Sequence, residues 1–293
     1  MSRLWAAPGR RASNDMDAAY IVCLSDKNKR DDNEDSYLVV EFTPHGARTP
    51  LLVLGVADGM GGYEHGAEVS REVLRQMCLS LFQSLAVECA LNGVPGGVAF
   101  GPVHLAAALQ EAAVIADGHI RRLVEANGWG MAGATVVVAA IYEGDVVAFN
   151  LGDSPLFHYE WASHSLCQLT EDHTYAQALV RGGVLAPHMG RYHEGSSQLE
   201  FYVGGGAFPL QPPVRYRKLE AGDLLLLCTD GVNRLLGPAK INALLRRMEG
   251  VVESSNGLAN MAETIVEAAR DAGEIDNQTL VLWRHVLPAA KGG

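Results

Sequence analysis

The order of strand-like and helix-like segments restricts the fold of this 293-residue chain. Seven short apolar runs of four to eight residues are rich in Val, Ile and Leu and bounded by Gly, Asp, Asn or Pro. Such runs are typical of buried strands. The predicted strands span residues 19–24, 37–42, 51–57, 135–142, 146–151, 224–228 and 279–283. The Glu-Gly-Asp sequence at 143–145 predicts a hairpin turn between two of them.

Two long segments have helical periodicity instead. Apolar side chains recur every four residues over 66–91, and residues 103–126 are rich in alanine. Residues 92–101 between them are dense in Gly and Pro, so we expect an antiparallel helical pair packed on a sheet. Two further helices are predicted at 238–248 and 258–272.

Strands and helices therefore do not alternate regularly, which disfavours a parallel, doubly wound sheet. The pattern favours an α+β fold in which a mainly antiparallel β-sandwich is covered by helices. There is no internal repeat and no long linker, so we expect a single domain over residues 18–287. Residues 1–17 lack an apolar signal core, and we expect a disordered tail there.

Composition excludes several classes of protein. With 34 acidic and 23 basic residues the net charge is −11, which would repel nucleic acid. The five cysteines form no C-x-x-C pair, which favours a reducing, cytoplasmic environment. No apolar run is long enough to span a membrane. We expect a cytoplasmic monomer that binds neither nucleic acid nor membrane.

Acidic residues stand at the ends of the predicted strands. Asp58-Gly59 follows 51–57, Gly152-Asp153 follows 146–151, and Asp230-Gly231 follows 224–228. Asp276 precedes 279–283, and the acidic segment 31–35 precedes 37–42. Any one Asp-Gly pair is explained by a turn. If all five sites converge, the carboxylates repel one another unless cations compensate them, and oxygen ligands suit Mg²⁺ or Mn²⁺.

Competing motifs fail on inspection. The chain has no G-x-x-x-x-G-K-[ST] phosphate loop, and Glu64 replaces the last glycine of a dinucleotide fingerprint at 59–64. Ser197 stands where a zincin needs its second His after His193-Glu194. The nucleophile elbow and the EF-hand loop are also incomplete.

Seven motifs occur in the order found in a known family. They are Arg30-x-x-Asn33-Glu34-Asp35, Asp58-Gly59-Met60-Gly61-Gly62, Gly133-Ala134-Thr135, Gly152-Asp153-Ser154, Leu169-Thr170-x-Asp172-His173, Thr229-Asp230-Gly231 and Asp276-Asn277-x-Thr279. The chain resembles the PPM family of metal-dependent (type 2C) serine/threonine protein phosphatases, and most of all its bacterial members. The resemblance covers roughly residues 22–283.

The resemblance implies an antiparallel β-sandwich of two sheets flanked by antiparallel helix pairs. It also implies two, and up to three, Mn²⁺ or Mg²⁺ ions. Asp58 would bridge two of them, while Asp230 and Asp276 would bind the second. Arg30 would bind the substrate phosphate, which makes Arg30, Asp58 and Asp230 the implied catalytic residues.

Further ligands follow from the same resemblance. The Gly59 carbonyl would complete one coordination shell, and Glu34 and Asp35 would hold metal-bound waters. Asp153 with Asp230 would bind the third ion. Met60 stands where animal relatives carry a histidine proposed as general acid, so the general acid stays open.

The expected function is hydrolysis of phosphoserine and phosphothreonine in proteins by a metal-activated water, without a covalent intermediate, in opposition to a bacterial Ser/Thr kinase. Two alternatives stay open: a non-catalytic relative that binds phosphoproteins, and a phosphatase of a small phosphorylated metabolite. Residues 181–213 correspond to the family's variable flap, in which His188 and His193 are expected to be ordinary exposed histidines. His173 is expected to have a structural role at a turn.

Overall fold

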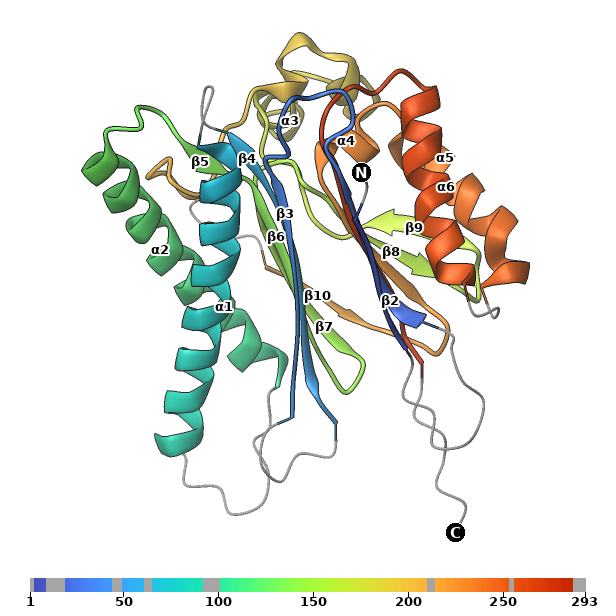
Figure 1. Ribbon diagram of the computed structural model, residues 1–293, viewed down its shortest axis with the longest axis horizontal. Coiled ribbons are helices and arrows are strands. Elements are labelled where there is room, and N and C mark those ends of the chain that lie inside the picture. The colour runs from blue at the N-terminus through green and yellow to red at the C-terminus, as the bar shows by residue number, and fades with distance from the viewer. Residues whose placement is uncertain are drawn as a thin grey trace.

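The computed structural model describes residues 3–8, 19–43, 49–60, 65–91, 101–209, 214–252 and 256–286. In this part of the chain two antiparallel sheets form the centre of the molecule (Figure 1). Sheet 1 has the order β1 (Arg3–Pro8), β2 (Ala19–Asp26), β12 (Gln278–Arg284), β11 (Leu224–Cys228), β8 (Leu156–Glu160) and β9 (Ser165–Gln168). Sheet 2 has the order β10 (Val214–Lys218), β7 (Asp145–Leu151), β6 (Val136–Tyr142), β4 (Leu51–Met60) and β3 (Asp35–Phe42), and the short β5 (Gly133–Ala134) also pairs with β4.

Helices cover the outer faces of both sheets (Figure 1). The pair α1 (Gly66–Leu91) and α2 (Pro102–Asn127) packs on sheet 2, and the pair α5 (Gly237–Met248) and α6 (Gly257–Asp271) packs on sheet 1. Shorter helical segments lie in the connections: α3 (Tyr175–Arg181), α4 (Asp230–Asn233), and the 3₁₀ turns Pro187–Tyr192, Glu194–Ser197 and Glu249–Val251.

Side-chain alternation along the strands builds three apolar layers. In β11, Leu224 and Leu226 pack against the helices, whereas Leu225 and Leu227 pack between the sheets. Successive side chains of a strand point to opposite faces, so a strand that is covered on both faces reads as an unbroken apolar run. This explains why these strands lack a polar face in the sequence.

The predicted α+β sandwich is confirmed, and the four predicted long helices lie within one residue of their predicted bounds at either end. The predicted turn at 143–145 is also present: Glu143 and Gly144 have φ values of 52° and 79°, as a tight hairpin turn of the primed type requires.

One expectation about the N-terminal tail is wrong. Arg3–Pro8 is not disordered but forms β1, which pairs antiparallel with β2. The reason is that β2 would otherwise end the sheet, and its open edge offers backbone hydrogen bonds to a further strand. The remaining residues of the predicted tail lie outside the described part of the chain.

No helix within the described ranges combines the length and the apolar character needed to cross a membrane.

Candidate metal centre

The strand registers bring the predicted acidic residues to one end of the sandwich. In sheet 2, Asp35 at the start of β3 lies opposite Asp58 near the end of β4. Val56 of β4 pairs with Val137, near the start of β6, and Val136 pairs with Leu151 at the end of β7, so Asp153 follows at the same edge. Because antiparallel strands start and end at alternate edges, acids that are distant in sequence meet here.

Sheet 1 contributes its acids at the corresponding edge. Cys228 at the end of β11 pairs with Leu280 near the start of β12. Asp230 therefore begins α4 directly above the end of one strand, and Asp276 precedes the next. A hydrogen bond from Thr229 Oγ1 to Asp35 Oδ2 (2.8 Å) joins the two sheets at this point.

Asp35 is buried with an incompletely satisfied carboxylate. Its Oδ1 has no hydrogen-bond partner among the described residues. Burial raises the pKa of Asp35 to about 7, although the hydrogen bond from Thr229 opposes this rise. A buried oxygen without a donor suits a cation or a water held by one.

The other sheet-2 acids also have raised pKa values. Burial raises the pKa of Asp58 well above its usual value, and the charges of Asp35 and Asp230 raise it further. Burial and the charge of Asp230 do the same to Asp153. Carboxylates with raised pKa values in one site indicate repulsion that a cation would relieve.

Two arginines face the sheet-1 acids. Arg30 Nη2 lies 2.8 Å from Asp276 Oδ2. Arg234 Nη1 lies 3.0 Å from Asp230 Oδ2, and its Nη2 lies 3.5 Å from Asp276 Oδ2 and 2.5 Å from Glu274 Oε1. Among the described residues, no three or more His, Cys, Asp or Glu side chains are already arranged as a complete metal-binding group. The carboxylates of sheet 1 are instead held by guanidinium groups.

Glu34 and Gly59 lie in a tightly packed corner beside Asp58. The Gly59 N–H donates to the Glu34 carbonyl (3.2 Å), and a Cβ on Gly59 would collide with the Gly66 carbonyl at the start of α1. A Cβ on Gly66 would in turn collide with the Glu34 carboxylate. Both glycines are therefore required by close approach. Partial burial raises the pKa of Glu34, and the charge of Arg30 opposes this rise.

Asn277 ties the Arg30 segment to β12. Its Oδ1 accepts from the Glu34 N–H (2.9 Å), and its Nδ2 donates to the carbonyls of Lys27 (3.0 Å) and Asp32 (2.9 Å). One amide thus orients the loop that carries Arg30, Glu34 and Asp35. The sequence motif contained Asn277, but its role became evident only from these contacts.

His173 has the structural role expected at a turn. Its Nδ1 accepts from the Gly152 N–H (3.2 Å), and the backbone N–H of His173 donates to the Gly152 carbonyl (2.9 Å). Burial lowers the pKa of His173 to about 4, so the ring is neutral at pH 7 and can accept. This pair of bonds fixes Gly152, whose φ is +109°, and with it the position of Asp153.

One contact to the Arg234 segment comes from the described residues between α3 and β10. Arg191 Nη2 donates to the Arg234 carbonyl (3.1 Å). His193 Nδ1 accepts from the Gly195 N–H (3.0 Å), which makes it a local cap, and residues 210–213 of the predicted flap lie outside the described ranges.

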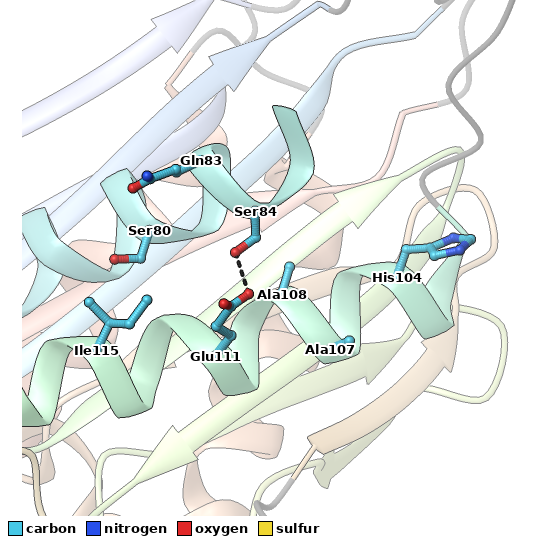
Figure 2. Close-up of a pocket in the computed structure, with 8 residues that line it drawn as sticks. All are labelled: Ser80, Gln83, Ser84, His104, Ala107, Ala108, Glu111 and Ile115. Atoms are coloured by element: carbon cyan, nitrogen blue, oxygen red, sulfur yellow. Dashed lines mark hydrogen bonds between the residues drawn. The ribbon is translucent and has the colours of Figure 1, made fainter. Parts of the chain in front are cut away.

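A cavity of about 290 Å³ lies away from the acids, between α1 and α2 (Figure 2). Its lining includes Ser80, Ser84, His104 and Glu111, and Ser84 Oγ donates to Glu111 Oε2 (2.6 Å). At a rise of about 1.5 Å per residue, Ser80 and Ser84 lie roughly 21–27 Å along α1 from Gly66. The cavity is thus separate from the acidic end of the sandwich.

Arg234 and Glu274 were not predicted from the sequence. The available signals were weak: Arg234 is four residues after Asp230, as in a helical ion pair, and Glu274 is two residues before Asp276.

Comparison with known proteins identifies the family. A family model described as protein phosphatase 2C matches residues 30–268. The protein phosphatase PhpP of Streptococcus pneumoniae is 26% identical over 262 residues, which cover 89% of this chain and 96% of PhpP. The serine/threonine protein phosphatase PstP of Mycobacterium tuberculosis is 28% identical over 254 residues, 86% of this chain and 42% of PstP.

Solved structures have the same fold. The crystal structure of Mycobacterium tuberculosis PstP/Ppp matches with a TM-score of 0.69 and 24% identity, over 91% of this chain and 98% of that one. The catalytic domain of a serine/threonine protein phosphatase PstP, solved with two manganese ions, matches with a TM-score of 0.63 and 22% identity, over 98% and 99% of the two chains. This chain therefore belongs to the protein phosphatase 2C family.

Proposed function

We propose that this chain is a Mn²⁺- or Mg²⁺-dependent phosphatase that removes phosphate from phosphoserine and phosphothreonine in proteins. Membership of its family makes it a protein phosphatase and a hydrolase. The observation that carries the metal assignment is the convergence of carboxylates from both sheets at one end of the sandwich. Burial raises the pKa of Asp58 well above its usual value, and the charges of Asp35 and Asp230 raise it further.

In this proposal Asp58, Asp230 and Asp276 would hold the two cations. The Gly59 carbonyl, Glu34 and Asp35 serve the same centre directly or through water, and Asp153 with Asp230 would hold a third ion. All these donors are oxygens, the ligands that Mg²⁺ and Mn²⁺ prefer. Cations bound there supply Lewis-acid stabilisation of the phosphoryl oxygens and lower the pKa of bound water.

In this proposal two residues of the chain orient the substrate phosphate: Arg30 binds it, and Asn277 holds the loop that carries Arg30. The Arg30 side chain is 54% exposed and contacts Asp276 through one nitrogen, so its other N–H groups can donate to phosphate oxygens. Asn277 holds the loop that carries Arg30, and this fixes the direction from which the guanidinium meets the phosphate. Hydrolysis by water needs no Ser, Cys or His nucleophile.

Related assignments belong to the same proposal. The chain would form a single phosphatase domain over about residues 18–287, act in the cytoplasm as a monomer and oppose a Ser/Thr kinase. Residues 181–213 would act as a flap beside the substrate. No described residue of the centre favours the alternative of a non-catalytic relative. Whether the substrate is instead a small phosphorylated metabolite is a question for experiment.

Hydrolysis of p-nitrophenyl phosphate by purified protein tests the metal assignment. We expect activity with Mn²⁺, its loss in EDTA, and near-complete loss in Asp230→Asn. Asp271→Asn, an exposed acid on α6, serves as the matched control and should keep full activity. Full activity of Asp230→Asn would contradict the metal mechanism.

A second assay tests the substrate class. Release of phosphate from a phosphothreonine peptide is compared with release from small phosphorylated metabolites at equal concentration. The proposal expects the higher kcat/KM for the peptide, and a preference for a metabolite would support the alternative.

A further inference from the structure

The Arg234 guanidinium joins three carboxylates at the sheet-1 side of the centre. It contacts Asp230 (3.0 Å), Glu274 (2.5 Å) and Asp276 (3.5 Å), and its Nε also donates to Glu274 Oε2 (3.3 Å). Two of these partners are proposed metal ligands, whereas Glu274 is not. Arg234 thus links the first turn of α4 to the loop that precedes β12.

Glu274 anchors this arginine. Its side chain is only 2% exposed, and both carboxylate oxygens accept from Arg234. Its Oε1 also accepts the backbone N–H groups of Ile275 (2.9 Å) and Asp276 (3.1 Å). The backbone that leads into Asp276 is therefore fixed to the same carboxylate that holds Arg234.

Arg234 could either compete with a cation for the two aspartates or orient them for it, and the charge of Glu274 decides between these effects. A lone arginine would compete with the metal for Asp230 and Asp276. Here Glu274 is buried against the guanidinium and offsets its positive charge, so the orienting hydrogen bonds remain while the net repulsion of a cation is small. Groups that bond to metal-ligating carboxylates in this way commonly tune affinity, and their loss costs about 10–100-fold.

We propose that Arg234, held by Glu274, is a positioning residue that sets the separation and orientation of Asp230 and Asp276 for cation binding. The inference rests on the proposed metal role of these two aspartates. Arg234 needs no contact with the substrate for this role. The arginine contacts the Oδ2 atom of each aspartate, and Asp230 Oδ1 takes no part in these contacts.

Calorimetric titration of metal-free protein with Mn²⁺ tests the inference. We expect Arg234→Met to bind Mn²⁺ about 10–100-fold more weakly than the wild type. Glu274→Gln should show a loss in the same direction, and the double variant should lose less than the sum of the two, because both changes break one linked arrangement. Circular dichroism at the titration temperature shows whether each variant is folded.

A conservative variant separates loss of positioning from loss of the folded structure. Arg234→Lys keeps a charge but cannot contact three carboxylates with a planar fork, so it should fold and still bind Mn²⁺ more weakly. Its phosphatase activity should recover as the Mn²⁺ concentration is raised, which a general loss of structure would not allow. Arg75→Met, which removes an exposed ion pair with Glu72 on α1, is the control and should leave Mn²⁺ binding unchanged.

The titrations distinguish a failure of the Arg234 inference from a failure of the proposed metal site. If Arg234→Met and Arg234→Lys bind Mn²⁺ as tightly as the wild type, or more tightly, the arginine is a competitor or a bystander and the inference is wrong. If Asp230→Asn binds Mn²⁺ like the wild type, the proposed metal site itself fails, and the inference fails with it.

Discussion

Thr229 donates a hydrogen bond from its hydroxyl to Asp35 Oδ2 (2.8 Å), and this bond crosses from the end of β11 in sheet 1 to the start of β3 in sheet 2. The same hydroxyl oxygen accepts the Thr279 N–H at the start of β12 (3.1 Å). One side chain therefore sets the distance between the two sheets where the acids meet.

Thr229→Val should lower the free energy of unfolding by about 1–3 kcal/mol, because it leaves a buried carboxylate oxygen and a backbone donor without a partner. Thr229→Ser keeps the hydroxyl and is the control. Urea unfolding in EDTA measures both. Equal stability of the Val variant and the wild type would contradict the assigned role of the bond.

Metal-free protein should lose stability as the pH rises from 6.5 to 8. The pKa of Asp35 is about 7 in the folded state and near 3.8 without the fold, so the folded state binds more protons until about pH 7. The raised pKa values of Asp58 and Asp153 act in the same direction. His173, with a pKa lowered from 6.5 to about 4, acts oppositely, but its contribution fades as the pH rises past 6.5.

Urea unfolding in EDTA at several pH values measures this dependence. Asp35→Asn should reduce the slope, and Mn²⁺ should reverse it, because a cation binds the deprotonated carboxylates. A stability that increases steadily to pH 8 in EDTA would show that the carboxylates are not buried together.

Asp153→Asn should have opposite effects without and with metal. In EDTA it removes one repelling charge from the cluster and should raise the free energy of unfolding, because burial and the charge of Asp230 raise the pKa of Asp153 in the folded state. In Mn²⁺ it removes a proposed ligand and should weaken metal binding. The exposed Asp271→Asn should change stability by less than about 0.5 kcal/mol in either condition.

Gly59→Ala should destabilise the protein by about 1–3 kcal/mol, since the new methyl group would collide with the Gly66 carbonyl and the Glu34 carbonyl. Gly118→Ala is the matched control. Its Cβ would meet only the flexible end of Arg122 within α2, and alanine should stabilise the helix by about 0.5–1 kcal/mol. Thermal unfolding of the two variants should therefore shift in opposite directions.

Much of the fold could be predicted because it depends on local periodicity. The spacing of apolar residues predicts the helices at 66–91 and 238–248, and an unbroken apolar run predicts β11. The strands β1, β9 and β10 were not predicted, and each lies at the edge of its sheet. The sequence of β10 is Val-Arg-Tyr-Arg-Lys, with exposed charges. An edge strand is defined by its neighbour's backbone, which a local pattern does not contain.

The residues of the candidate centre also fall into those that local sequence predicts and those that it does not. Asp58, Asp153, Asp230 and Asp276 were found because each ends or precedes a buried strand. Arg234 and Glu274 were missed because their pairing depends on α4 meeting the loop before β12, 40 residues later. Nothing in either local sequence indicates this contact.

The position of β12 in the middle of sheet 1 has a consequence for the timing of activity. This strand lies between β2 and β11, and Asp276 and Asn277 enter the centre with it. At about 5–20 residues per second, a ribosome needs roughly 12–50 s to make the chain between Asp35 and Asp276. During that interval the earlier acids are present without Asp276. If Asp276 has its proposed role as a metal ligand, the chain becomes active only when this late strand has been inserted between two older ones.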